Sequence, residues 1–407
     1  MKILHIIAYS PVRPTFGGAL RMHHILRLLA ARHDVTVVAF GEDAEAEAYQ
    51  AEFGHRLRAV HMVPFRWTTR YRRLAQLVAF WREKSYFYSA VHTRRMEETI
   101  RRLVRENAYD VVLTEFSSMG SYEFETTAVK VLDSHNIEYD NFRRVWEKTR
   151  SPLRKLHYYD EYRKFAKEEI ENYRRQDVVF FTSERDRSLV AASLPGVRTA
   201  VVPNGVDAAY FAPGGAKPEP ATLVFTGAMS YVPNNDGAIW FLDHVFPKIL
   251  ERVPEARVAI VGIQPPKELL RRNSSNVLVT GYVDDVRPYV HGASAFIVPL
   301  RMGGGTRLKV LEAMAMRIPI VSTSIGCEGI NVRDEESILI ADEPSAFADA
   351  VVRVLSDAAL RARLTAAGAE LVHREYEWQV VGEGIERLLL EAVAAGPTRT
   401  RTGKEPR

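Results

Sequence analysis

Short apolar runs alternate with amphipathic stretches along the whole chain, and most of the runs are continuously apolar. Continuous runs are typical of strands that are buried on both faces of a parallel sheet. The expected strands are 3–8, 34–40, 110–114, 129–133, 177–182 and 199–203 in the first half, and 222–227, 257–262, 276–281, 294–299, 318–323 and 337–341 in the second. Helical patterns separate most of them, for example 19–32, 235–252, 306–316 and 345–355. Strands that alternate with helices form a doubly wound α/β sheet, and so many strands fit two Rossmann-like parallel-sheet domains in tandem better than one.

A stretch rich in proline, glycine and short polar residues, 201–221, marks the seam between the two domains. We therefore expect a first domain over 1–200 and a second over 201–378. A closing helix over 379–395 follows, and we expect it to pack back on the first domain. The tail, 396–407, has almost no apolar residues and is expected to be disordered.

The composition is that of a globular protein, because 46% of the 407 residues are hydrophobic and 26% are charged. No run of about 18 apolar residues occurs, so no transmembrane helix is expected. The apolar part of the N-terminus is too short for a signal peptide, and the one cysteine, Cys327, allows no internal disulfide. These features fit a cytoplasmic protein.

The net charge of +4 is mild, but the basic residues are concentrated in two places. Residues 66–95 combine eight Lys/Arg and seven aromatic residues with one acid. A second stretch, 143–175, mixes basic, aromatic and acidic residues. Basic residues interleaved with aromatics suit an anionic membrane surface or a nucleic acid. The alternative is a solvated helix face whose aromatic side chains belong to the core.

The stretch 302–316 (M-G-G-G-T-R-L-K-V-L-E-A-M-A-M) places Gly303, Gly304 and Gly305 between an expected strand and a helix that should begin at Thr306. Backbone N–H groups at such a junction bind anions, and glycine allows a phosphate to approach closely. Ligands of doubly wound sheets bind beyond the carboxyl ends of the strands. We therefore expect the site in a cleft where the strand ends of the two domains face each other.

Lys309 and Glu312 are three residues apart on this expected helix, so their side chains share one face. A lysine beside a phosphate and a carboxylate that accepts hydrogen bonds from a ribose diol would together hold a nucleotide. The alternative is a glycine turn followed by an ion pair on a surface helix. The Walker A pattern is absent, so a loop of the NTP-hydrolysing type is not expected.

Two loops of the first half are further candidates. Gly17 and Gly18 join the first strand to a helix without the G-x-G-x-x-G spacing, and either a close approach to a ligand or a plain tight turn would explain them. His135 follows strand 129–133, where a histidine can donate to a sugar hydroxyl or transfer a proton, although an isolated loop histidine is more often structural. No group of histidines and acids has metal-ligand spacing, so no metal site is expected.

Several motifs, in their order and spacing, resemble those of the GT-B glycosyltransferases, in particular the retaining enzymes of family 4. They are V-P-N-G-V-D (202–207), F-T-G-A-M (225–229), P-N-N-D (233–236), I-V-G (260–262), G-Y-V (281–283), P-L-R-M-G-G-G-T-R-L-K-V-L-E-A-M-A (299–315), P-I-V (319–321) and Y-E-W (376–378). The resemblance covers nearly the whole chain and implies the GT-B fold, with two Rossmann-like domains facing across a cleft. It also implies that the second domain binds a nucleotide-sugar donor, a UDP- or GDP-sugar, and that the first binds the acceptor.

By this resemblance, Glu312 matches the second of two family glutamates, which holds the ribose hydroxyls. The first of the two, which contacts the transferred sugar, falls at Gly304, so the chain departs from the family pattern there. The charge of the diphosphate would be met by Lys309 as the first choice and by Arg307 as the second.

Other residues are assigned by the same resemblance. Gly227 and Asn234 lie in the matched donor motifs and are expected to bind the donor. Gly17 and Gly18 match an acceptor-side loop whose backbone meets the donor phosphate. His135 matches a histidine that reaches the donor sugar, and we expect it to be the catalytic residue.

The resemblance implies transfer with retention of the anomeric configuration, without a metal or other cofactor, to a glycan or a lipid-linked acceptor. Together with the stretch 66–95, it favours peripheral contact with an anionic membrane at its cytoplasmic face. One alternative is a sugar-nucleotide epimerase of the same fold, although its acid and base carboxylates cannot be located here. Another is a nucleic-acid-binding protein, which would leave the glycine loop unexplained, so no nucleic-acid partner is expected.

Overall fold

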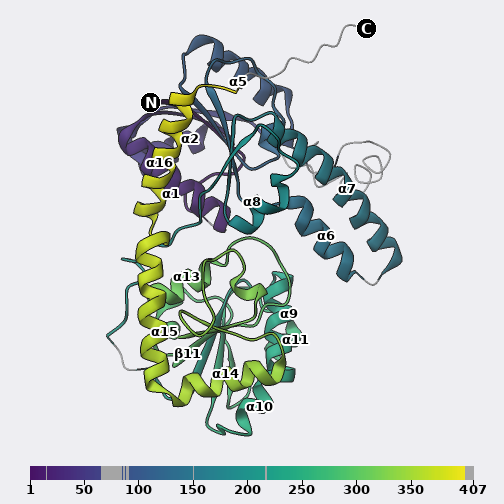
Figure 1. Cartoon of the computed structure of the whole chain (residues 1–407), viewed down its shortest axis with the longest axis vertical. Helices are drawn as coiled ribbons and strands as arrows, with labels where there is room; N and C mark the ends of the chain where they lie inside the picture. The colour runs from purple at the N-terminus through teal and green to yellow at the C-terminus, as the bar shows by residue number, and fades with distance from the viewer. Residues whose placement is uncertain are drawn as a thin grey trace. The chain divides into compact units, whose positions relative to one another are not determined.

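The computed structural model describes residues 1–14, 16–65, 85, 88, 91–149, 151–215 and 218–398. The chain forms two compact units (Figure 1). Unit 1 comprises Met1–Val202 together with Gly382–Arg407, and unit 2 comprises Pro203–Val381. The seam expected at 200/201 lies two residues before this division.

Unit 1 contains a seven-stranded parallel sheet in the order β3-β2-β1-β4-β5-β6-β7. Its strands are β1 (Lys2–Ile7), β2 (Asp34–Phe40), β3 (Leu57–Val63), β4 (Val111–Glu115), β5 (Val129–Ser134), β6 (Val178–Phe181) and β7 (Arg198–Val201). The helices are α1 (Gly17–Arg32), α2 (Asp43–Phe53), α5 (Arg94–Glu106), α6 (Glu138–Lys148), α7 (Pro152–Arg174) and α8 (Glu184–Ala191), with short turns at Gly54–Arg56 and Met119–Ser121.

Unit 2 contains a six-stranded parallel sheet in the order β10-β9-β8-β11-β12-β13. Its strands are β8 (Thr222–Thr226), β9 (Arg257–Val261), β10 (Val277–Val279), β11 (Ala295–Val298), β12 (Ile320–Ser322) and β13 (Leu339–Ile340). The helices are α9 (Val232–Trp240), α10 (Phe246–Leu250), α11 (Lys267–Leu270), α12 (Arg287–His291), α13 (Leu308–Ala315), α14 (Pro344–Ser356) and α15 (Ala358–Leu371), with a turn at Ile325–Cys327 and π-helical segments at Phe241–Val245 and Val372–Tyr376. The last helix, α16 (Trp378–Ala395), begins in unit 2 and continues into unit 1.

The order of the strands makes both units doubly wound, as expected. The order reverses between β1 and β4 in unit 1 and between β8 and β11 in unit 2. Such switch points are where loops diverge and ligands bind in sheets of this kind. The loops after β1, β4, β8 and β11 are therefore the first places to look for a site.

Strand β3 was missed by the sequence pattern. Arg58 and His61 interrupt its apolar residues, and the strand lies at the edge of the sheet, where half-exposed positions tolerate polar side chains. The helix expected over 235–252 is also divided, into α9, a π-helical segment and α10. Pro247, which lacks a backbone N–H, follows the π-helical segment and accounts for the interruption.

Most of the basic stretch 66–95 and most of the tail 396–407 lie outside the described residues, so the expectations for them remain predictions. Within the described part of the chain, no helix is both long enough and apolar enough to cross a bilayer. Cys327, the one cysteine, is buried.

Candidate functional site

The candidate donor residues of unit 2 lie at its switch point. Gly227 directly follows β8, and the glycine loop, defined as Gly303–Gly305, follows β11. Helix α13 begins at Leu308, two residues later than Thr306, so the glycine loop is separated from the first helical turn. The expected junction between loop and helix is present, with a longer connection than the sequence pattern indicated.

Arg307 holds the glycine loop in place. Its side chain is buried, and Nη1 donates a hydrogen bond to the carbonyl oxygen of Gly304. Gly303 has a φ of 109° and Gly305 a φ of 76°, which are backbone conformations that side chains disfavour. The hydroxyl of Thr306 is buried and has no hydrogen-bond partner among the described residues. Arg307 therefore shapes the loop, and its role as the second choice of phosphate ligand stays a prediction.

Lys309 reaches from α13 to the end of β8. Its Nζ donates to the carbonyl oxygen of Thr226 at 2.6 Å and to Oδ1 of Asn234 at 2.9 Å. It also lies 4.4 Å from the centre of the Phe225 ring, which favours a cation. Two of the three ammonium N–H groups are thus used within the protein, and one is left for a ligand.

Gly227 lies close to this ammonium group. A Cβ atom at Gly227 would lie 2.8 Å from Nζ of Lys309 and 2.7 Å from Nδ2 of Asn234. Asn234 is itself oriented by donating from Nδ2 to the carbonyl oxygen of Ala228 at 2.9 Å. The structure therefore brings Gly227, Asn234 and Lys309 together, although Asn234 and Lys309 are 75 residues apart in the chain.

The ionisation of Lys309 and Glu312 is shifted towards neutrality. Burial, with a further contribution from the positive charge of Arg307, lowers the pKa of Lys309 to about 7. Burial raises the pKa of Glu312 to about 7, and the nearby Lys309 only partly opposes this shift. The Glu312 carboxylate accepts no hydrogen bond from any described residue, so both of its oxygens are available to a ligand.

In unit 1, Gly18 and His135 are brought together at the carboxyl ends of β1 and β5. Gly17 and Gly18 are the first two residues of α1, and His135 directly follows β5. A Cβ atom at Gly18 would lie 3.1 Å from Nδ1 of His135, 2.8 Å from the Phe16 ring and 3.0 Å from the Phe116 ring. The absence of a side chain at Gly18 therefore lets these three rings pack against the start of α1. The approach of a ligand to Gly17 and Gly18 stays a prediction.

His135 is buried and is tied to Glu115 at the end of β4. Its Nε2 lies 2.6 Å from Oε2 of Glu115, and Nε2 of His5 lies 2.6 Å from the other carboxylate oxygen. Burial alone would raise the pKa of Glu115, but hydrogen bonds and attraction from His135 and His5 outweigh it and lower the pKa. An ionised carboxylate can only accept hydrogen bonds, so both Nε2 atoms carry protons.

Nδ1 is the second ring nitrogen of His135, and it does not face Glu115. It is buried and has no hydrogen-bond partner in the described part of the protein. In the neutral imidazole it carries a lone pair, and a ligand hydroxyl could donate to it. His135 is thus oriented by Glu115 and has one buried ring nitrogen without a hydrogen-bond partner among the described residues.

A second buried ion pair adjoins this group. Asp133 accepts two hydrogen bonds from Arg21 of α1, at 2.7 Å to Nε and 2.8 Å to Nη2. Glu115, Asp133 and His135 each offer one oxygen or nitrogen atom, and these three atoms lie within 4.8 Å of one another. Three such atoms could together ligate a cation. The two carboxylates are already satisfied by Arg21 and by two imidazole N–H groups, so a cation would have to displace these donors. The absence of a metal site remains a prediction.

The sequence pattern did not single out Glu115, His5, Arg21 or Asp133. One signal was present, because His5 interrupts an otherwise apolar strand. Leu4 and Ile6 belong to the core cluster that contains residues of α5, so His5 points to the opposite face of the sheet. Glu115 resembles any acid at the end of a strand, and nothing in the sequence pairs it with His135.

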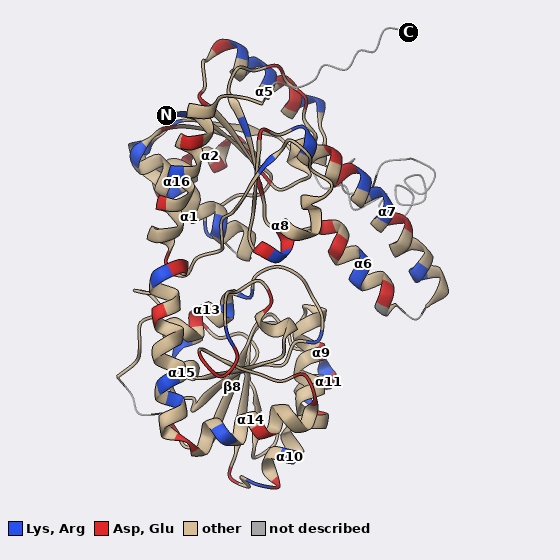
Figure 2. Ribbon diagram, viewed as in Figure 1, with Lys and Arg blue, Asp and Glu red and all other residues tan. Residues whose placement is uncertain are grey.

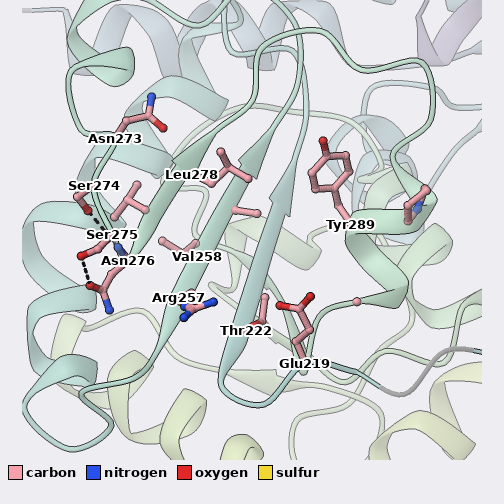
Figure 3. A pocket seen from close by; sticks show the side chains of 14 residues that line it. Glu219, Thr222, Arg257, Val258, Asn273, Ser274, Ser275, Asn276, Leu278 and Tyr289 are labelled. Atoms are coloured by element: carbon pink, nitrogen blue, oxygen red, sulfur yellow. Dashed lines mark hydrogen bonds between the residues drawn. The ribbon is translucent and has the colours of Figure 1, made fainter.

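A hollow of about 490 Å³ lies elsewhere in unit 2. Figure 3 shows its lining, with Thr222 at the start of β8, Arg257 at the start of β9 and Leu278 on β10. These are the amino ends of the strands, opposite to Gly227 and the glycine loop. None of the expected donor residues lines it.

Comparison with known families gives two adjacent matches. The family model described as Glycosyltransferase Family 4 matches residues 17–210, and the one described as Glycosyl transferases group 1 matches residues 220–357. The first covers most of unit 1, and the second covers the switch point of unit 2 with the glycine loop, Lys309 and Glu312.

Individual relatives are distant. An uncharacterized 44.6 kDa protein in the cps region of Klebsiella pneumoniae is 23% identical over 367 residues, covering 86% of this chain and 90% of the relative. Phosphatidyl-myo-inositol mannosyltransferase of Mycobacterium tuberculosis is 29% identical over 210 residues, covering 48% of this chain. The chain spans just over half the length of that mannosyltransferase, 54%.

Two solved structures show the same fold. Anabaena Alr3699/HepE in complex with UDP has a TM-score of 0.70 at 13% identity, over 96% of this chain and all of the other. Sucrose-phosphate synthase from Thermosynechococcus elongatus has a TM-score of 0.68 at 16% identity, over 96% of this chain and 99% of the other. The family matches, the two doubly wound sheets and these structures agree with the resemblance found in the motifs. The chain is a glycosyltransferase with the GT-B fold and belongs to glycosyltransferase family 4.

Proposed function

We propose that this glycosyltransferase transfers a sugar from a nucleotide-sugar donor and that unit 2 binds the nucleotide. The observation that carries the proposal is the pair of Lys309 and Glu312 beside the glycine loop at the switch point of unit 2. The ammonium group has one N–H left for a phosphate, and the carboxylate has both oxygens left for the hydroxyls of a ribose. Backbone N–H groups of the glycine loop and of the first turn of α13 would bind the diphosphate.

The chemistry of transfer explains why these groups are needed. Positive charge develops on the anomeric carbon, and negative charge develops on the departing diphosphate. Lys309 and the backbone N–H groups would stabilise that negative charge without a metal ion. We propose retention of the anomeric configuration, with the acceptor attacking from the face that the diphosphate leaves.

Unit 1 supplies His135 in this proposal. Its Nδ1 would accept a hydrogen bond from a hydroxyl of the transferred sugar, while Glu115 holds the ring by Nε2. The backbone of Gly17 and Gly18, the first two residues of α1, would meet the donor phosphate. Glu115 is then a positioning residue, because it acts through His135.

For the acceptor we propose a glycan or a lipid-linked sugar, and for the donor a UDP- or GDP-sugar. A phosphatidyl-myo-inositol mannosyltransferase among the relatives and a structural neighbour in complex with UDP support these classes. We further propose that the protein works at the cytoplasmic face of a membrane.

A thermal-shift panel of nucleoside diphosphates and nucleotide sugars tests the proposal. We expect one nucleotide class to raise the melting temperature, because a ligand that binds the folded state stabilises it. The shift should disappear in Glu312→Ala and persist in Glu255→Ala, a matched change at an exposed glutamate of the same unit. A panel without any shift, or an unchanged shift in Glu312→Ala, would contradict nucleotide binding at this site.

Retention, metal independence and the distinction between transfer and epimerisation are each tested by a separate measurement. The anomeric configuration of the product, read by NMR, tests retention, and activity in the presence of EDTA tests metal independence. Incubation of the donor without acceptor separates transfer from epimerisation, because only an epimerase would convert the nucleotide sugar under those conditions.

A further inference from the structure

Helices α6 and α7 form a long hairpin in unit 1. They pack against each other along their length and extend away from the seven-stranded sheet (Figure 1). At the base of the hairpin, Phe142 stacks on Phe165 with ring centres 4.6 Å apart. Asp140 accepts hydrogen bonds from Arg143, Arg144 and Arg185, which fixes the start of α6 to α8. The hairpin is thus firmly anchored at one end.

The other end exposes apolar side chains. We call residues 143–149 and 151–159 the hairpin tip. Leu153 is 84% exposed, Leu156 is 54% exposed and Val145 is 45% exposed. Leu153, Leu156 and Tyr159 follow one another at intervals of three residues, so they lie towards one side of α7. Exposed leucines grouped in this way indicate a surface that is covered by a partner.

Aromatic rings lie next to these leucines. Trp146 of α6 stacks on Tyr162 of α7 with ring planes 5° apart, and its ring centre lies 5.1 Å from that of Tyr159. Tyr159 is itself exposed. Tryptophan and tyrosine are enriched where proteins meet the headgroup region of a bilayer, because one end of each ring is apolar and the other polar.

The hairpin tip carries a net positive charge. By sequence it contains five Lys/Arg and one acid, Glu147, but Arg143 and Arg144 are paired with Asp140. Arg154 and Lys155 are exposed, and their side chains have no ion-pair or hydrogen-bond partner in the described part of the chain. They lie between Leu153 and Leu156 in the sequence of α7, and Figure 2 shows basic residues on both helices of the hairpin. Apolar and basic residues therefore share one exposed surface.

We propose that the hairpin tip docks on the surface of an anionic lipid bilayer. Leu153 and Leu156 would enter the boundary between headgroups and acyl chains, Trp146 and Tyr159 would lie at the headgroup level, and Arg154 and Lys155 would contact lipid phosphates. Charge complementarity selects this occupant over a second copy of the chain, because two such tips would repel each other. The proposal rests on unit 1 alone and is independent of nucleotide binding.

Sedimentation of the full chain with vesicles tests it. We expect the protein to pellet with vesicles of phosphatidylcholine containing about a third of phosphatidylglycerol, and not with pure phosphatidylcholine, since each basic residue near an anionic surface strengthens binding about fivefold. Raising the salt concentration should weaken the binding. The double variant Leu153→Ser, Arg154→Glu should lose at least about tenfold in partition coefficient.

A matched control is available in unit 2. Leu270 and Arg271 form another exposed leucine–arginine pair, and Leu270→Ser, Arg271→Glu makes the same chemical change outside the hairpin. This control should pellet like the wild type. The proposal would be overturned if the wild-type protein did not pellet, or if it pelleted equally with neutral vesicles. It would also be overturned if the hairpin variant pelleted as much as the wild type. A dimer that forms without lipid and is lost in the hairpin variant would overturn it as well. The nucleotide thermal shift, measured on the same samples, shows whether the variants are folded. It also tests nucleotide binding separately from membrane binding.

Discussion

Glu115 joins His135 to His5 through its two carboxylate oxygens, each 2.6 Å from an imidazole Nε2. The three side chains are buried, and they come from the first strand, from β4 and from the loop after β5. The carboxylate fixes both rings with Nε2 protonated, which sets the role of Nδ1 in His135 without any direct contact between Glu115 and a substrate. The orientation of the proposed catalytic histidine therefore depends on a residue at the end of the neighbouring strand, β4.

Glu115→Gln should impair turnover more than donor binding. A glutamine can accept from one imidazole only, because its NH₂ group would face the second Nε2–H. We expect kcat to fall at least about tenfold, since His135 loses its fixed tautomer, and the free energy of unfolding to fall by about 1.5–3 kcal/mol. Steady-state kinetics and urea unfolding measure the two effects.

The control for this variant is the nucleotide thermal shift, which should persist because Glu115 belongs to unit 1 and the proposed nucleotide site to unit 2. Glu115→Asp keeps the charge and should recover part of kcat. If Glu115→Gln had wild-type kcat with the expected loss of stability, Glu115 would be structural only.

Gly18→Ala tests the close approach beside His135. The added Cβ would lie 2.8 Å from the Phe16 ring and 3.1 Å from Nδ1 of His135, so both rings must shift. We expect a loss of about 1–3 kcal/mol in the free energy of unfolding, as for other overpacked sites, together with a lower kcat. Gly215→Ala, where an added Cβ meets no atom within 4 Å, should change neither quantity appreciably. Equal effects of the two substitutions would show that the close packing of the Phe16 and His135 rings against Gly18 is not needed.

The sequence predicted the fold well and the site only in outline, for reasons that particular residues show. Strands such as β8 and β11 are buried on both faces and therefore read as continuous apolar runs, whereas β3 at the sheet edge carries Arg58 and His61 and was missed. Lys309 was expected to face a ligand with Glu312, and the structure adds that it is held by Asn234 and by the backbone of β8. Such contacts arise from strand order, which the local pattern does not encode.

Donor affinity should be greatest near pH 7. Burial raises the pKa of Glu312 to about 7, so below that pH the carboxyl becomes protonated and loses acceptor capacity for a ribose. Burial lowers the pKa of Lys309 to about 7, so above that pH the ammonium is lost and the attraction to the diphosphate with it. On the acidic and on the alkaline limb of this profile, the donor affinity should fall by at most about tenfold per pH unit. Calorimetric titration with a nucleotide sugar measures this, because its diphosphate does not itself titrate in this range.

Lys309→Arg provides the control for the alkaline limb. Arginine stays protonated, so the variant should lose the fall in affinity above pH 7 while keeping the fall on the acidic side. Glu312→Gln should bind more weakly and lose the acidic limb. Affinity that is independent of pH between 6 and about 9 in the wild type would contradict the assignment of these two groups to the donor site.

The end of α16 provides a test of how the closing helix is held by unit 1. A Cβ at Gly382 would clash with Cδ1 of Leu28 in α1, whereas one at Gly384, on the same helix, meets nothing within 4 Å. Arg32 and His33 also pair with Glu386 further along α16.

Gly384→Ala should stabilise the protein by about 0.5–1 kcal/mol, because alanine favours a helix over glycine. Gly382→Ala has the same intrinsic gain but must push α16 away from Leu28, so its net effect should be destabilising by about 1–3 kcal/mol. The melting temperatures of the two variants, compared with that of the wild type, test whether α16 packs on α1 at Gly382. If both substitutions raised the melting temperature equally, α16 would not be packed on α1 in solution.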